Sequence, residues 1–416
     1  MTDFSPWTDA VRTGLAADPT YGAVVPPMYL SSNYTFEGVG QAREYDYSRS
    51  GNPTRDLLGE ALATLEGGAG ATAVATGLAG ITLVAEAFVP AGGRVVAQHD
   101  AYGGTWRLFT FLAEQGRFAV DFVDFNDDAA LTEALGRGPA VVWAETPSNP
   151  LLRITDIRKT AEAAHAAGAL LVVDNTFLSP LLQRPLEHGA DLVLHSTTKF
   201  VNGHSDVVGG AVVARTQEHH EKLRLWANAL GLTGSPFDAF LTLRGLRTLD
   251  ARLRVHAENT AALVSVLQDH PAVGTLYWPG LASHPGHELA ARQQSGFGSL
   301  LSIDLAGGRA AAERFLDGLE IFHLAESLGG VESLVCHPAS MTHAGMTEEA
   351  RATAGISDGL LRLSVGIEGR DDLVAVTSRA LERASCSASR SPWPSATPAW
   401  SGAPGPETGS SSPAPR

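Results

Sequence analysis

Short apolar runs alternate with amphipathic helical stretches between residues 61 and 255. The runs are rich in Val, Leu and Ala and are apolar on both faces, which is typical of buried parallel strands. The stretches between them, such as residues 156–167, have the spacing of helices that pack on a sheet. The pattern predicts a three-layer α/β domain with a mostly parallel sheet, with strands at residues 71–76, 94–97, 118–123, 140–144, 169–173, 192–194 and 207–213.

The segments on either side of this region have different patterns. Residues 1–60 hold few periodic apolar positions and many turn formers, so they predict an extended N-terminal arm. A long helical pattern at residues 241–268 leads into less regular elements. These predict a smaller α+β domain over residues 256–384, with strands at 299–305 and 361–365 and helices at 310–319 and 371–383.

The last 32 residues, 385–416, form a segment of biased composition. They contain nine serines and seven prolines and show no apolar period. Such a composition cannot bury enough apolar surface to offset the entropy of ordering, so this segment is predicted to be a disordered tail.

Composition narrows the class of protein. The net charge of −15 argues against a nucleic-acid partner and against a polybasic membrane surface. The chain has no apolar run of the roughly 18 residues typical of a spanning helix, and its N-terminus lacks a signal-peptide pattern. Two cysteines, Cys336 and Cys386, are too few for a disulfide scaffold, and the 14 histidines are mostly scattered singly, so no metal site is expected. We therefore expect a cytosolic protein that acts on small polar molecules.

Lys199 is one of only three lysines in the chain. Lys159 and Lys222 lie in polar helical stretches, whereas Lys199 follows the apolar run at residues 192–194. Ser196 and Thr198 are expected to alternate on a strand that ends at this lysine. A primary amine at such a strand end can form a Schiff base with the aldehyde of pyridoxal phosphate (PLP). The alternative is a lysine that only caps a strand.

Three further features fit a PLP site. Asp174 follows the expected strand at 169–173, where its carboxylate could keep a pyridine nitrogen protonated or could simply cap a turn. Gly77 and Leu78 open a helix after an apolar strand, so their N–H groups could hold a phosphate, although tight turns need glycine anyway. Tyr102, before two glycines, could stack on a cofactor ring or pack as a loop aromatic.

Five segments together resemble the motifs of the Cys/Met-metabolism PLP-dependent enzymes. The likeness runs in order from about Tyr21 to Arg383. It implies PLP as the cofactor and the fold type I, aspartate aminotransferase-like arrangement of PLP-dependent transferases, with a smaller α+β C-terminal domain. The segments are Tyr47 to Thr54, Ala101 to Gly104, Glu145 to Pro150, Val173 to Thr176 and Ser196 to Lys199.

The resemblance also implies residue roles. Lys199 would hold the cofactor and move protons, Asp174 would pair with the pyridine nitrogen, and Tyr102 would stack on the ring. Tyr47 and Arg49 would reach the phosphate in a neighbouring subunit, which implies an active dimer, usually assembled as a homotetramer. The other expected cofactor contacts are Gly77, Leu78, Thr176, Ser196 and Thr198, and the expected substrate contacts are Arg107, Asn149, Glu326, Ser327 and Arg362.

Within the family, the likeness is greatest to members that carry out γ-replacement. It implies that an activated homoserine, such as an O-succinyl or O-acetyl ester, is joined to L-cysteine to give L-cystathionine. Glu326 is the discriminating residue, since a glutamate here could attract the amino group of the incoming cysteine; otherwise it is an acidic loop residue of no consequence. Three alternatives stay open: γ-elimination of cystathionine, replacement by sulfide or another nucleophile, and a non-catalytic binding protein of the same fold. The sequence lacks the full dinucleotide fingerprint of a dehydrogenase.

Overall fold

The computed structural model describes residues 4–15 and 17–386. The described residues up to Ser385 belong to one compact unit. The predicted tail lies outside the described residues from position 387 onward. The expected domain boundaries near residues 60, 255 and 384 stay predictions.

In the described part of the chain, seven strands form a large sheet in the order β1-β7-β6-β5-β4-β2-β3. The strands from β2 to β6 are parallel, and β7 pairs antiparallel with β1 and with β6. The α/β class and the mostly parallel sheet are therefore confirmed. The strands are β1 (Gly70–Val74), β2 (Arg94–Gln98), β3 (Ala119–Val123), β4 (Val141–Glu145), β5 (Leu170–Asp174), β6 (Leu192–His195) and β7 (Gly210–Ala214).

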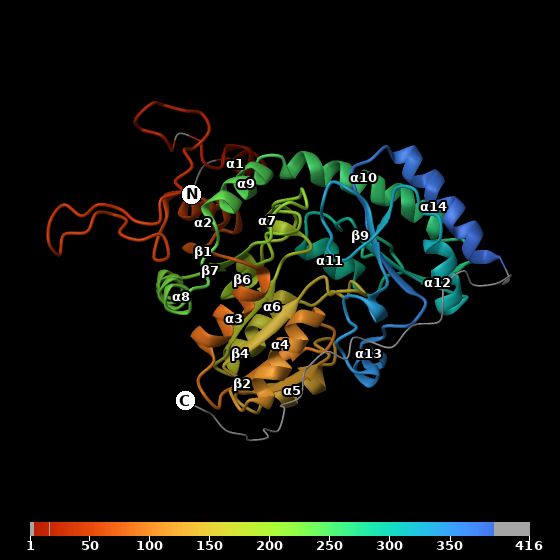
Figure 1. The fold of residues 1–416 in the computed structure, drawn as a ribbon. Helices are drawn as coiled ribbons and strands as arrows, with labels where there is room; N and C mark the ends of the chain where they lie inside the picture. The colour runs from red at the N-terminus through yellow and green to blue at the C-terminus, as the bar shows by residue number, and fades with distance from the viewer. Residues whose placement is uncertain (1–3, 16, 387–416) are drawn as a thin grey trace, which may run out of the picture. The chain divides into compact units, whose positions relative to one another are not determined.

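Helices cover both faces of this sheet, as the three-layer prediction requires (Figure 1). Successive residues of a strand point to opposite faces, so Val142 and Trp143 belong to different core clusters. The cluster of Val142 packs against α2 (Pro53–Glu66), α5 (Asp128–Leu135), α6 (Ile157–Ala166) and α7 (Ser179–Leu182). The cluster of Trp143 packs against α3 (Gly77–Phe88), α4 (Gly103–Glu114) and α8 (Gln217–Leu230).

A second sheet has the order β10-β11-β12-β9-β8 within the described residues. One of its faces packs against three helices through a separate core of Leu, Val, Ala and Phe side chains. On β9, Ser302 donates a hydrogen bond to the carbonyl of Pro150, which joins this sheet to the loop after β4. The strands are β8 (Val273–Tyr277), β9 (Leu300–Leu305), β10 (His323–Leu324), β11 (Leu334–Cys336) and β12 (Leu360–Ser364), and the helices are α10 (Leu249–Leu267), α12 (Gly308–Leu316) and α14 (Arg370–Ser385).

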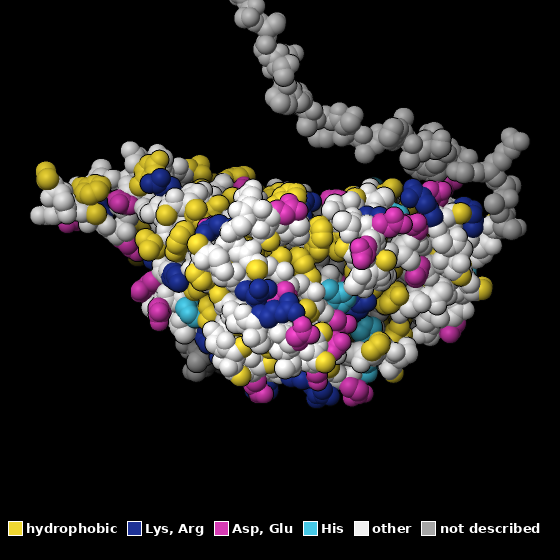
Figure 2. All heavy atoms as spheres, turned by 90° about the horizontal axis from the view of Figure 1, so that it is seen from below, with side chains coloured by type: hydrophobic (Ala, Val, Ile, Leu, Met, Phe, Trp, Pro, Cys, Tyr) yellow, Lys and Arg dark blue, Asp and Glu magenta, His cyan; other side chains and the backbone are white. Residues whose placement is uncertain are grey.

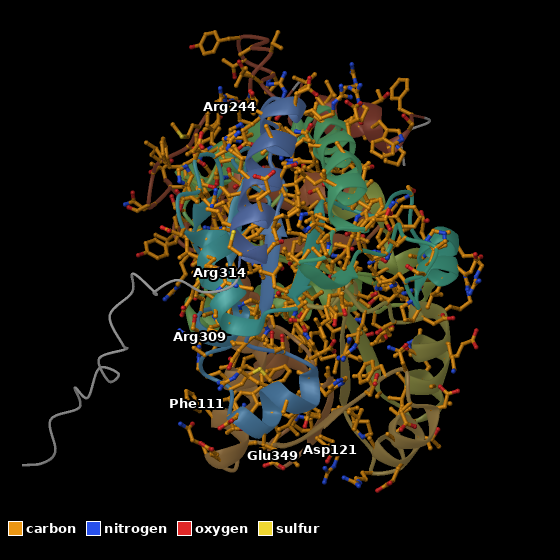
Figure 3. All side chains as sticks on the ribbon, turned by 90° about the vertical axis from the view of Figure 1, so that its right-hand side faces the viewer. Phe111, Asp121, Arg244, Arg309, Arg314 and Glu349 are labelled. Atoms are coloured by element: carbon orange, nitrogen blue, oxygen red, sulfur yellow. The ribbon has the colours of Figure 1, made fainter. Side chains whose placement is uncertain are left out.

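Arg314 of α12 fixes the end of α14 (Figure 3). Its guanidinium donates to the carbonyl oxygens of Arg383 and Ala384 at 3.2 and 3.0 Å. A cation at a helix C-terminus satisfies carbonyl groups that have no partner within the helix. The last described helix is thus anchored to α12, which packs on the second sheet.

The prediction of one helix over residues 241–268 is wrong. The structure contains α9 (Pro236–Leu246) and, after a break of two residues, α10, which Figure 1 shows running from the neighbourhood of α9 to α14. The N–H of Thr248 donates to the carbonyl of Gly245 at 3.1 Å, and Arg252 Nη2 donates to the same oxygen at 2.8 Å. The break is therefore stabilised by a side chain that supplies a donor where the helix is interrupted.

The expected N-terminal arm is only partly irregular. It contains α1 (Pro6–Arg12) and the first turns of α2, and between these helices the chain projects as an exposed arm (Figure 1). Asn52 begins α2 because its side-chain oxygen accepts the N–H groups of Thr54 and Arg55. The remaining helices are α11 (His287–Gln293) and α13 (Glu348–Ala354). Among the residues described, no helix is long and apolar enough to cross a membrane.

Candidate active site

The carboxyl ends of β4, β5 and β6 open into a cavity of about 400 Å³. The N-terminus of α3 and strand β12 of the second sheet contribute other walls. Twelve of the fifteen residues expected at the site line this cavity. They are Gly77, Leu78, Tyr102, Asn149, Asp174, Thr176, Ser196, Thr198, Lys199, Glu326, Ser327 and Arg362.

Lys199 lies in a turn and not at the end of a strand. Strand β6 ends at His195, so the expectation that Ser196 and Thr198 alternate on a strand is wrong. Thr198 instead exchanges hydrogen bonds with the backbone of Gly209: its Oγ1 accepts the Gly209 N–H at 3.0 Å and donates to the carbonyl at 3.2 Å. This contact also explains why β7 starts at Gly210, later than the predicted residue 207.

The amine of Lys199 is aimed across the cavity. Its Nζ donates to Ser327 Oγ at 2.7 Å. Burial and, to a smaller extent, the nearby Arg362 lower the pKa of Lys199 to about 8, while Glu326 acts in the opposite direction. A large fraction of this lysine is therefore neutral, and nucleophilic, only slightly above neutral pH.

Asp174 and Glu145 are neighbours at the ends of parallel strands β5 and β4. Asp174 Oδ1 accepts hydrogen bonds from the N–H and the hydroxyl of Thr176, at 3.0 and 2.5 Å. Burial raises the pKa of Asp174, while these two hydrogen bonds and His195 lower it. Burial and then the charge of Asp174 raise the pKa of Glu145 well above its usual value. Of this pair, Asp174 is the more easily ionised, because Thr176 donates two hydrogen bonds to its carboxylate.

The start of α3 is suited to an anion. Thr76 caps the helix by accepting the N–H of Ala79 at 2.8 Å. Gly77 and Leu78 are the first two residues of the helix, so their N–H groups have no acceptor within it. A Cβ on Gly77 would lie 2.8 Å from the Cβ of Ser196, so only glycine allows this close approach. Backbone donors and the hydroxyls of Ser196 and Thr198 thus share one end of the cavity.

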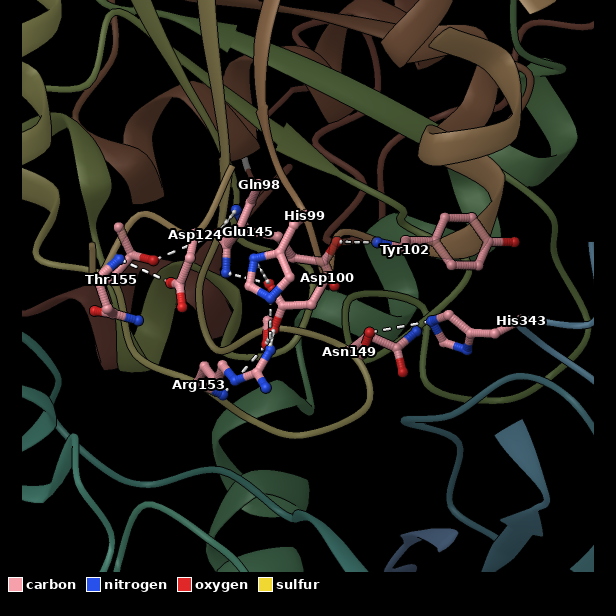
Figure 4. A network of polar contacts seen from close by, with 12 residues as sticks. Gln98, His99, Asp100, Tyr102, Asp124, Glu145, Asn149, Arg153, Thr155 and His343 are labelled. Atoms are coloured by element: carbon pink, nitrogen blue, oxygen red, sulfur yellow. Dashed lines mark hydrogen bonds and ion pairs between the residues drawn. The ribbon is translucent and has the colours of Figure 1, made fainter. Parts of the chain in front are cut away.

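Arg362 connects the second sheet to the cavity. Its Nη1 donates to Asn149 Oδ1 and its Nη2 to the carbonyl of Ser327, both at 2.8 Å. The residue is 2% exposed, and its buried Nε has no partner among the described residues. His343 donates from Nε2 to the Asn149 carbonyl at 3.1 Å, and burial lowers the pKa of His343 to about 4 (Figure 4). A fixed guanidinium with a spare donor is a typical carboxylate receptor.

Three expected residues do not line this cavity. Tyr47 and Arg49 lie on the exposed arm, where Arg49 Nε donates to Asn228 Oδ1 at 3.1 Å. Arg107 of α4 influences the site by its charge, which lowers the pKa of Tyr102, whereas burial raises it more strongly. Conversely, the sequence reasoning gave no role to Glu145 or Thr342, which do line the cavity. The strand-end position of Glu145, the same as that of Asp174, is the signal that could have found it.

The donor set fits PLP. The cavity combines a lysine with a lowered pKa, a carboxylate that accepts two hydrogen bonds from Thr176, and a glycine-opened helix start that a side chain on Gly77 would fill. These are the groups that an aldehyde, a pyridine nitrogen and a phosphate require. The Nε of Arg362, which has no partner within the part of the chain that the structure describes, leaves a further donor for an amino-acid carboxylate.

Comparisons with known proteins agree with this chemistry. A family model described as "Cys/Met metabolism PLP-dependent enzyme" matches residues 7–382. The chain is 56% identical over 368 residues to cystathionine γ-synthase of Escherichia coli, covering 88% of this chain and 95% of that protein. It is 45% identical over 377 residues to cystathionine γ-lyase of Dictyostelium discoideum, covering 90% and 97%.

A solved structure extends the likeness to three dimensions. It is a cystathionine γ-synthase from Xanthomonas oryzae pv. oryzae in complex with cystathionine, with a TM-score of 0.91 and 64% identity. The match covers 92% of this chain and 99% of that chain. The chain belongs to the family of Cys/Met-metabolism PLP-dependent enzymes.

Proposed function

We propose that the protein joins an O-acylated homoserine to L-cysteine by γ-replacement and forms L-cystathionine. The observation that carries this proposal is the placement of Glu326 on the same cavity wall as Ser327, with Lys199 and Arg362 around it. The names of the relatives from E. coli and X. oryzae support it. The reaction forms a bond between the cysteine sulfur and Cγ of homoserine, breaks the bond between Cγ and the ester oxygen, and releases the acyl group as a carboxylate together with the proton of the thiol.

Bound PLP supplies an aldehyde that captures amino groups and a pyridine ring that withdraws electrons from the attached carbon skeleton. Asp174, whose carboxylate accepts two hydrogen bonds from Thr176, would pair with the ring nitrogen and favour its protonated form. Lys199 Nζ, held by Ser327 Oγ at 2.7 Å, takes the proton from the substrate Cα and delivers protons to neighbouring carbons. Gly77, Ser196 and Thr198 would hold the phosphate end.

Two residues select and orient the substrates. Arg362 holds the α-carboxylate of the homoserine ester, with Asn149 fixing the plane of the guanidinium. The Glu326 carboxylate attracts the ammonium group of the incoming cysteine and so brings its sulfur to Cγ. A neutral or anionic nucleophile without an ammonium group, such as sulfide, would gain nothing from Glu326.

The test is product analysis by mass spectrometry. The purified protein is incubated with O-succinyl- or O-acetyl-homoserine, with and without L-cysteine, and separately with cystathionine. Cystathionine formed from the ester and cysteine is the expected result. Efficient release of cysteine and 2-oxobutanoate from cystathionine, with little replacement, would make the protein a γ-lyase. Which acyl ester reacts faster is an outcome of the same assay, and the cytosolic location remains a prediction.

Cofactor capture should depend on pH through Lys199. Its pKa is lowered to about 8, so the neutral, nucleophilic amine accumulates as pH rises through about 8. We expect the rate at which PLP-free protein takes up PLP to rise between about pH 7 and 9 and then to level off. Stopped-flow absorbance measures this rate. A rise that continues toward pH 10.5, the ordinary lysine value, would contradict the burial argument.

We also propose that the protein works as a dimer of this chain, with a homotetramer as the expected assembly. The projecting arm exposes many large apolar side chains, among them Tyr21 at 90% and Val39 at 106% of full exposure, and Figure 2 shows apolar side chains on this projection. Exposed apolar surface of this kind marks an interface. A second copy would cover it and receive Tyr47 and Arg49 at its cavity.

Mixing two inactive variants tests this assignment. We expect Lys199→Ala and Arg49→Ala to recover activity when co-refolded, because one site of each hybrid dimer has both residues intact. Random pairing would restore about a quarter of wild-type activity. The matched control is Lys199→Ala mixed with Arg362→Ala, whose residues share one cavity and should not complement. Equal recovery in both mixtures, or none in either, would contradict an arm that acts in a neighbouring subunit.

A further inference from the structure

Glu145 lines the cavity at the end of β4, beside Asp174. It is the last residue of β4 and is 4% exposed. Its Oε2 accepts the backbone N–H of Tyr102 at 2.7 Å, a contact between loops that are 43 positions apart (Figure 4). The N–H group of Asn149 also stabilises the ionised form of this carboxyl. Glu145 therefore contacts the backbone of Tyr102 directly and lies close enough to the Asn149 N–H to be influenced by it.

The surrounding polar network ties the same two loops together. The N–H of Glu145 donates to Gln98 Oε1 at 3.1 Å, and Gln98 Nε2 donates to Asp100 Oδ1 at 2.8 Å. Asp100 Oδ2 in turn accepts from Ser148 Oγ at 2.6 Å and from Arg153 Nη1 at 3.0 Å. These contacts hold the loop after β2 against the loop after β4. Glu145 is the member of this network that also reaches the cavity wall.

The carboxylates near Glu145 favour the protonated form of its side chain. The carboxylates that face it are Asp174 on β5 and Asp100 on the loop after β2, and both raise its pKa in addition to burial. The opposing influences are the backbone N–H groups of Tyr102 and Asn149. A protonated Glu145 keeps an oxygen that accepts from Tyr102 and adds no second negative charge beside Asp174.

We propose that Glu145 is a positioning residue, whose side-chain oxygen fixes the backbones of Tyr102 and Asn149 and thereby the two side chains beside the cofactor. This inference rests on the cofactor-facing roles proposed above for Tyr102 and Asn149. It assigns to the end of β4 a task distinct from that of Asp174 at the end of β5. The amide of glutamine, which offers the same acceptor without a charge, should serve in its place.

Two substitutions of similar volume test the proposal. Glu145→Gln keeps the acceptor, whereas Glu145→Met removes it. We expect Glu145→Gln to bind PLP within about threefold of wild type and to keep its visible circular dichroism. We expect Glu145→Met to weaken PLP binding roughly tenfold and to reduce the visible circular dichroism, because the Tyr102 N–H loses its buried acceptor. Both are measured on purified protein titrated with PLP.

Two reference variants separate the possible failures. Asp191 precedes β6 at the amino ends of the parallel strands, opposite to the ends that form the cavity, and accepts the Leu171 N–H at 2.8 Å. Asp191→Leu removes this carboxyl and should leave the visible circular dichroism unchanged. Tyr102→Ala should change that signal. If Tyr102→Ala changes it and Glu145→Met does not, the positioning role is overturned while the proposed reaction stands. If Glu145→Gln loses as much PLP affinity and visible circular dichroism as Glu145→Met, the hydrogen-bond acceptor does not position the loops, and the proposal also fails.

Hydrogen exchange keeps the proposal testable if Glu145→Met does not fold. In the wild-type protein and in Glu145→Gln, the Tyr102 amide should exchange much more slowly than the exposed amides of the arm. Exchange of the Tyr102 amide as fast as those exposed amides would overturn the proposal.

Discussion

Replacing Lys199 with alanine should lower turnover by at least about 1,000-fold, because a single amine both holds the cofactor and moves protons during the reaction. The structure gives this amine a fixed position, with Nζ 2.7 Å from Ser327 Oγ, and a pKa lowered to about 8. The other two lysines cannot replace it. Lys159 pairs with Asp128 on the surface at 2.5 Å, and Lys222 lies over the ring of Phe88 at 4.8 Å.

Steady-state rates and the visible spectrum check this result. Lys222→Ala is the matched control and should keep both the rate and the cofactor band. Lys199→Arg retains a positive charge but cannot supply a neutral amine, so it should be as inactive as Lys199→Ala. A Lys199→Arg protein with more than a tenth of wild-type turnover would contradict the role in proton transfer.

Replacing Arg362 should chiefly weaken substrate binding. The guanidinium is oriented by Asn149 Oδ1 and the Ser327 carbonyl, and its buried Nε has no partner among residues 4–15 and 17–386. Lysine offers one point charge where arginine offers a planar fork. A charge-assisted hydrogen bond is worth roughly 1.5–3 kcal/mol, so Arg362→Lys should raise the KM for the homoserine ester about 10- to 100-fold.

The control for this change is Arg379→Ala, which breaks a surface pair with Glu320 and should leave KM unchanged. The visible band of PLP should persist in Arg362→Lys, since this residue is proposed to bind substrate. An unchanged KM together with a lost cofactor band would show that Arg362 retains the cofactor and does not bind the substrate.

Much of the site was predictable because the ends of buried strands can be recognised in the sequence. Buried parallel strands appear as short apolar runs, and the polar residue that ends a run lies at the sheet edge where ligands bind. Asp174 was found in this way, and Lys199 lies one turn beyond the end of β6. Glu145 ends β4 in the same manner, so its place at this edge of the sheet follows from the same pattern.

Other features depend on contacts that no local pattern contains. The break between α9 and α10 is stabilised by Arg252, whose guanidinium bonds to Gly245 from the next helix. The turn that carries Lys199 is held by Thr198 and Gly209, eleven positions apart. Arg362 reaches the cavity only because the second sheet places β12 beside the loop after β4. Tyr47 and Arg49 lie away from this chain's own cavity, so their expected role requires a second copy.

The central claim is that Lys199 is the residue that carries the cofactor in this cavity. Sodium borohydride reduction of the PLP-loaded protein, followed by digestion and mass spectrometry, tests it directly, because reduction converts the Schiff base to a stable amine on the modified lysine. We expect the phosphopyridoxyl group on the peptide that contains Lys199. A label on Lys159 or Lys222, or no label on a protein that retains PLP, would contradict it.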